Sequence, residues 1–166
     1  MTDIKLSTTL FGEIIVPYEE GVFQDCTLTL DEKETTFNLY LMEKSITDTL
    51  TKTVVKFLDN LPLLYQKAKA AVLSSTDSEL LSYFTEFHLE ELADELLPLF
   101  SVDSADEITK EMFLSALKLR GVRIGLNNQN ELDCVLDLCL DEEITDELLV
   151  IYFDTQFEIT DMSHES

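Results

Sequence analysis

The chain has 166 residues, of which 34 are acidic and 11 are basic, giving a formal net charge of -23. A surface this negative repels nucleic acids and anionic membranes and attracts basic proteins, so the first two are excluded as partners. Hydrophobic residues make up 45% of the chain, and this much apolar surface predicts a folded protein and not a disordered acidic tail.

No Gly/Ser-rich or Pro-rich stretch divides the sequence, so we expect a single domain over residues 1–166. The four glycines are isolated, and neither phosphate-binding glycine motif is present. The three cysteines lie in apolar alternating runs without a C-x-x-C spacing, which is typical of small buried hydrophobic side chains. With a polar start and no long apolar run, these features predict a cytoplasmic protein.

The first predicted elements are strands. Between residues 10 and 42, apolar and polar side chains alternate, which predicts three antiparallel strands joined as a meander. From residue 46 the apolar spacing becomes helical and predicts helices over 46–61 and 62–73, divided at Pro62. A third helix carries apolar residues from Leu80 to Leu97, and a short fourth helix covers 108–116.

Strands return in the last third of the chain, over 119–126, 132–140, 149–153 and 157–159. This order predicts an α+β fold with a mostly antiparallel sheet, built from N- and C-terminal strands and covered on one face by the central helices. The opposite face would carry the aspartates of the 132–140 strand.

Acidic residues are unevenly distributed. No Lys or Arg lies between Lys69 and Lys110, and none follows Arg123. Unpaired like charges repel one another, so we predict an acidic face that binds a basic protein partner, with solubility as the simpler explanation. The predicted partner-binding residues are Glu86, Glu90, Glu91, Asp94 and Glu95 on a single helix, and Asp133, Asp137 and Asp141 on a strand.

The other polar residues predict no catalytic, cofactor-binding or metal-binding site. Lys110, Lys118, Arg120 and Arg123 form the one dense basic segment, and we expect them to pair with nearby carboxylates, a local anion site being the alternative. His88 could share a helix face with an acidic residue, but the spacing matches no zinc motif. We therefore expect His88 and His164 to be ordinary surface or partly buried side chains. The protein is predicted not to be an enzyme and to need no cofactor.

Three segments resemble the uncharacterised bacterial family called domain of unknown function 2004. They are Phe11-Gly12-Glu13-Ile14, the stretch Phe57–Leu61 leading into Tyr65–Lys69, and the ending Leu148–Phe153 followed by Phe157–Ser166. The resemblance covers most of the chain and implies a small cytoplasmic protein. It supplies no catalytic residues.

Together, these observations predict an acidic, non-enzymatic binding protein of the bacterial cytosol. Its most concrete form is an immunity-type inhibitor that docks its carboxylates onto a basic toxin. The alternative is a housekeeping or assembly protein that acts by self-association, with its charge serving only solubility.

Overall fold

The computed structural model describes residues 3–17, 20–42, 47, 49–74 and 79–166. The strands are β1 (Ile4–Thr8), β2 (Gly12–Val16), β3 (Val22–Leu30), β4 (Lys33–Leu41), β5 (Lys118–Leu126), β6 (Leu132–Cys139), β7 (Leu148–Phe153) and β8 (Ile159–Glu165). The helices are α1 (Thr51–Asp59), α2 (Leu61–Ser74), α3 (Glu79–Glu91), α4 (Ala93–Phe100) and α5 (Lys110–Ala116), with a 3-10 turn at Ala105–Glu107.

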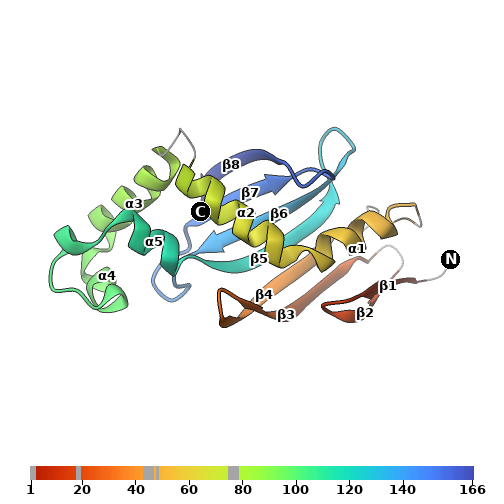
Figure 1. Ribbon diagram of the computed structural model, residues 1–166, viewed down its shortest axis with the longest axis horizontal. Coiled ribbons are helices and arrows are strands. Elements are labelled where there is room, and N and C mark those ends of the chain that lie inside the picture. Colours follow the sequence, from red (N-terminus) through yellow and green to blue (C-terminus); the bar gives the residue numbers. More distant parts are fainter. Residues whose placement is uncertain (1–2, 18–19, 43–46, 48, 75–78) are drawn as a thin grey trace.

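The main sheet contains six strands in the order β3-β4-β5-β6-β7-β8. All neighbouring strands are antiparallel except β4 and β5, which run parallel and are joined by the whole helical segment. In Figure 1, α1 and α2 lie across one face of this sheet. The predicted α+β class, with a mostly antiparallel sheet from both ends of the chain and helices between them, is confirmed.

The predicted three-stranded N-terminal meander is confirmed only in part: β3 and β4 form the expected antiparallel hairpin, but β2 does not join them. The chain forms four strands before α1, and β1 and β2 make a separate two-stranded sheet. Strand β1 was not predicted because the alternation of its apolar and polar residues is short and the first residues of the chain are polar. Its Leu6 is nevertheless completely buried. Asp59 of α1 fixes this hairpin, because its Oδ1 accepts from the amides of Thr9 at 2.7 Å and Leu10 at 3.3 Å.

The core lies between the helices and one face of the main sheet. Alternation along the strands turns one set of side chains toward α1 and α2. The strands contribute Phe37, Leu39, Leu41, Val122, Ile124, Cys134, Leu136, Leu138, Leu149, Ile151 and Phe153 to this core. The two helices contribute Val54, Phe57, Leu58, Leu61, Leu64, Ala68 and Val72. These periodicities explain why the strands and helices form where they do.

The predicted third helix is in fact two helices. The backbone of Leu92 leaves helical geometry at φ -134° and ψ 27°, and α4 begins at the next residue. The turn lets α4 pack against α3 and buries Leu96 completely. No Gly or Pro marks this turn, which is why the periodicity of leucines was compatible with one helix. The predicted start of the first helix at residue 46 lies outside the described residues.

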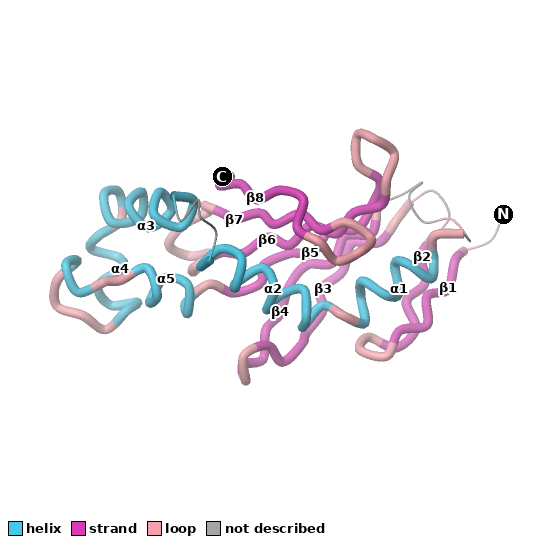
Figure 2. Tube along the Cα trace, turned by 45° about the horizontal axis from the view of Figure 1, so that its top comes forward, coloured by secondary structure: helices cyan, strands magenta, loops and turns pink. Residues whose placement is uncertain are grey.

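Helices α3, α4 and α5 extend beyond one end of the sheet, as Figure 2 shows. Among the residues that the structure describes, no helix packs on the sheet face turned away from α1 and α2. Asp133 and Asp137 alternate along β6 with the core residues Cys134, Leu136 and Leu138, so they lie on this open face, as predicted. None of the helices in the described ranges combines the length and apolar character that a membrane crossing requires.

Candidate functional site

The segment between β6 and β7, residues 141–147, is the acidic loop: five of its seven residues are Asp or Glu. Asp141 closes its turn, because the Asp141 backbone oxygen accepts from the amides of Ile144 and Thr145 at 3.0 Å. The Asp141 side chain accepts from the amide of Glu143 at 2.9 Å. These hydrogen bonds fix the shape of the loop and engage one oxygen of a predicted partner-binding residue.

A groove of about 430 Å³, the acidic groove, lies between the acidic loop and the end of α3. Its apolar lining comes from Phe87, Leu92 and Ile144. Its carboxylates are Glu91, Glu142, Glu143, Asp146 and Glu147. A groove lined by both kinds of side chain suits a partner that offers a cation beside an apolar anchor.

Two of the five groove carboxylates have a cationic or histidine partner close by. Glu142 lies 3.7 Å from Nε of Arg120, and Glu147 lies 2.6 Å from Nε2 of His164. Across the residues that the structure describes, no ion pair engages Glu91, Glu143 or Asp146. Unpaired carboxylates keep their negative potential available to an incoming cation.

The five helical residues of the predicted partner-binding set are all exposed, but they occupy two helices. Glu86, Glu90 and Glu91 belong to α3, and Asp94 and Glu95 lie in the first turn of α4. Negative side chains in a first turn interact favourably with the partial positive charge of the helix N-terminus. That interaction gives Asp94 and Glu95 a role in helix stability. Glu91 is the member that lines the acidic groove.

The three predicted strand residues do not share one surface. Asp141 starts the acidic loop, just after β6 ends, whereas Asp133 and Asp137 lie on the open face of the sheet. Both flank Arg123, and Asp137 Oδ1 lies 3.5 Å from a terminal nitrogen of its guanidinium. Burial raises the pKa of both carboxyl groups, and the nearby Arg123 opposes that rise. The structure therefore groups Glu91 with the acidic loop in one groove, which Asp133 and Asp137 do not line.

His88 is completely buried, contrary to the expected surface or partly buried side chain. Its Nδ1 lies 2.7 Å from the Phe84 carbonyl, which can only accept, so Nδ1 carries the proton. The Nε2 atom then accepts from the hydroxyl of Thr145 at 3.1 Å. Aromatic rings of Phe84, Phe87 and Phe113 pack around the imidazole. Burial lowers the pKa of His88, so the ring is neutral at pH 7.

Two histidines thus hold the second half of the acidic loop, one at Thr145 and the other at Glu147. His88 reaches Thr145 from α3, and His164 reaches Glu147 from β8. Thr145 also accepts from the amide of Glu147 at 3.1 Å. Sequence reasoning missed these contacts because they join segments far apart in the chain, although the run of acids at 141–147 was visible.

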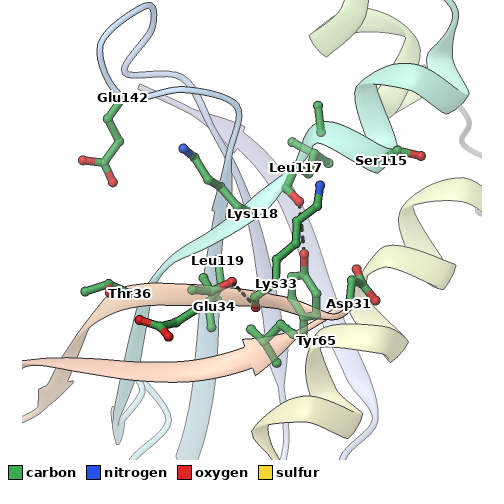
Figure 3. A pocket seen from close by; sticks show the side chains of 13 residues that line it. Asp31, Lys33, Glu34, Thr36, Tyr65, Ser115, Leu117, Lys118, Leu119 and Glu142 are labelled. Carbon is green, nitrogen blue, oxygen red and sulfur yellow. Dashed lines mark hydrogen bonds between the residues drawn. The ribbon is translucent and has the colours of Figure 1, made fainter. Parts of the chain in front are cut away.

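A second hollow, of about 280 Å³, lies at the end of the sheet between the β3–β4 turn, α2 and the start of β5. Figure 3 shows Lys33 and Lys118 reaching into it from neighbouring strands. Tyr65 closes its base by donating from its hydroxyl to the Leu117 carbonyl at 3.0 Å. Asp31 and Glu34 also line it, so its charges are mixed.

The cysteines are poorly placed for nucleophilic catalysis. All three cysteines are buried and unpaired, and burial raises the pKa of the Cys139 thiol to about 11 and that of Cys134 further. Such thiols stay protonated at neutral pH and are weak nucleophiles. Over the described ranges, no three His, Cys, Asp or Glu side chains are arranged to hold a metal ion.

Comparisons with known protein families, with curated proteins and with solved structures find no match for this chain. The resemblance to domain of unknown function 2004 stays a prediction.

Proposed function

We propose that this chain is a non-enzymatic binding protein whose acidic groove docks a basic partner protein. The observation that carries the proposal is a set of carboxylates that no ion pair engages among the described residues, Glu91, Glu143 and Asp146, beside the apolar Phe87 and Leu92. Electrostatic attraction speeds the encounter with a cationic surface and disfavours wrong partners. An apolar side chain entering the groove adds affinity through its burial.

The most concrete form of the proposal is an immunity-type inhibitor in the cytoplasm of a bacterium, which covers the active site of a basic toxin. The net charge of -23 and the pairing of apolar and acidic groups in one groove support it. Co-expression with a basic secreted protein encoded beside this gene tests it. Survival that depends on the groove carboxylates is the expected result.

A binding measurement tests the groove directly. The probe is a labelled peptide of alternating Lys and Leu, and the variant combines Glu91→Gln, Glu143→Gln and Asp146→Asn. We expect about a tenfold or greater loss of affinity, and a wild-type affinity that falls with added salt.

A matched control makes that loss specific. Glu20→Gln, Glu131→Gln and Glu158→Gln remove the same number of charges from exposed residues at the opposite ends of the strands. We expect the control to change affinity by less than about threefold. Equal losses in the two triple variants would mean that net charge alone acts and that the groove is not the site.

Self-association is the second candidate, and one observation favours it. Strand β3 is an edge of the sheet, and its Phe23 is 73% exposed. Unpaired edges and exposed aromatic side chains are features through which copies of a protein associate. Sedimentation of the wild type and of Phe23→Ala tests this candidate. A dimer that persists in high salt and is lost in the variant supports it over the acidic groove.

A further inference from the structure

The open face of the sheet carries a hollow of about 460 Å³, the sheet hollow, lined by residues of β3 to β7 together with Asp146 of the acidic loop and Ser166. Its carboxylate side chains are Asp137 and Asp146. The volume is within the range of pockets that hold small molecules. Arg120 and Arg123 both line it, and they are the only arginines in the sequence. A chain with net charge -23 thus places both of its guanidinium groups in one hollow.

A β-bulge brings the two arginines together. On a regular strand, residues three apart point to opposite faces of the sheet. The register between β5 and β6 shifts between Leu119 and Gly121, which makes Arg120 the extra residue of a bulge. Bulges redirect side chains in this way and are frequent beside functional sites. The shift lets Arg120 and Arg123 line the same hollow.

Neither guanidinium is saturated with hydrogen bonds. Each offers five N–H donors. Arg123 has a single long contact, 3.5 Å from a terminal nitrogen to Asp137, and its buried Nε has no partner within the described structure. Arg120 lies 3.7 Å from Glu142, a side chain that is itself largely exposed. Both arginines can therefore donate to a further acceptor without losing a strong pair.

An aromatic wall stands beside these cations. Phe23 packs edge-to-face on Tyr40 with ring centroids 6.2 Å apart, and Phe23 is the most exposed of the exposed apolar side chains. Register pairs place Phe23, Tyr40 and Arg123 in one row across β3, β4 and β5. Gly121 lies next to this row and contributes no side chain to the hollow.

We propose that the sheet hollow binds a small molecule that carries an oxyanion on an aromatic ring, with the oxyanion at Arg120 and Arg123 and the ring against Phe23 and Tyr40. Arginine forms bidentate, charge-assisted hydrogen bonds with carboxylate and phosphate oxygens. Aromatic rings pack favourably in offset or edge-to-face contact. This site goes beyond the docking of a basic protein, since it is a different hollow and takes a ligand of opposite charge, although Asp146 lines both the sheet hollow and the acidic groove.

Calorimetric titration tests the site with two probes, phenyl phosphate and 3-phenylpropionate, which distinguish a phosphate from a carboxylate ligand. We expect at least one probe to bind at millimolar concentration or below, and the neutral 3-phenylpropanol not to bind. Arg123→Gln should lower affinity about tenfold to a hundredfold, since a charge-assisted pair is removed. Phe23→Ala should lower it severalfold.

Two further variants separate binding from folding. Gly121→Ala adds a methyl group in the hollow, where its Cβ would meet Asp137 Oδ2 at an ordinary 3.4 Å, so we expect weaker binding with an unchanged melting temperature. Lys52→Gln removes an exposed cation on α1 and should leave binding unchanged. The proposal is overturned if neither probe binds, if Arg123→Gln binds as tightly as the wild type, or if inorganic phosphate binds as tightly as phenyl phosphate.

Discussion

Nε2 of His88 lies 3.1 Å from Oγ1 of Thr145, and this hydrogen bond ties the buried face of α3 to the acidic loop. The Phe84 carbonyl holds the proton on Nδ1, so Nε2 must accept and the threonine must donate. The titratable groups that face this imidazole are His164 of β8 and Glu147 of the acidic loop. The shape of the acidic groove therefore depends on a neutral histidine.

Stability should fall below neutral pH through His88. Burial lowers the pKa of His88 in the folded protein, whereas the unfolded chain takes up this proton near the ordinary pKa of 6.5. The stabilisation by neutral His88 is thus complete above pH 6.5 and is lost as the pH falls below it. Urea unfolding at pH 7.5 and 5.5 measures the loss, which should be larger in the wild type than in His88→Gln. Parallel losses in the two proteins would show that His88 does not titrate in this way.

Removal of the Thr145 hydroxyl should destabilise the fold. Thr145→Val keeps the shape of the side chain but leaves the buried Nε2 of His88 without a donor. A buried polar atom without a partner costs about 1–3 kcal/mol in the free energy of unfolding. Thr145→Ser keeps the hydroxyl and is the control, expected to lose less. Chemical denaturation of both variants is the measurement, and equal stability of the valine and serine variants would contradict the prediction.

Tyr65 should titrate above the ordinary pKa of a tyrosine. Burial raises the pKa of Tyr65 to about 12, and its hydroxyl donates to the Leu117 carbonyl. Stability from this group is complete below the ordinary pKa of 10 and is lost as the pH rises toward 12. Absorbance of tyrosinate should show a late step that is missing in Tyr65→Phe. The variant should lose about 0.5–1.5 kcal/mol at pH 7 for the hydrogen bond.

Phe84 should be a large contributor to stability. It is completely buried and its ring contacts those of His88, Phe113 and His164 at centroid distances of 4.4, 6.3 and 5.2 Å. Phe84→Ala should cost about 3–5 kcal/mol, from lost burial and the cavity that remains. Phe23→Ala is the matched control, since Phe23 is largely exposed, and it should change stability by less than about 0.5 kcal/mol. Similar losses for the two variants would contradict the packing described above.

The sequence was sufficient for the fold class because its two apolar periods are strong. Alternation located β5 to β7, and helical spacing located α1 and α2. It was insufficient where the decisive interaction is tertiary. The turn at Leu92 carries no breaker residue, and the pairing of β1 with β2 depends on a hairpin that α1 holds through Asp59.

The kind of residue that forms the candidate site could be predicted from the sequence, but its position in the fold could not. The excess of Asp and Glu predicted an acidic binding surface, yet the grouping of Glu91 with the acidic loop depends on how α3 packs beside β8. The partners of His88 lie in its own helix and in the loop after β6, and no spacing in the sequence relates His88 to Thr145. A bulge at Arg120 likewise leaves no sequence signal, because it is defined by the register with β6.

The parallel pair of β4 and β5 bears on how the chain reaches its native state. Leu39 and Val122 lie side by side, although every helix of the protein is placed between them in the sequence. Contacts that close so long a segment form late, because the entropy of closure must be overcome before the pairing stabilises anything. During synthesis the β3–β4 hairpin therefore leaves the ribosome long before β5 exists, and the edge of β4 stays unpaired until the last third of the protein has been made.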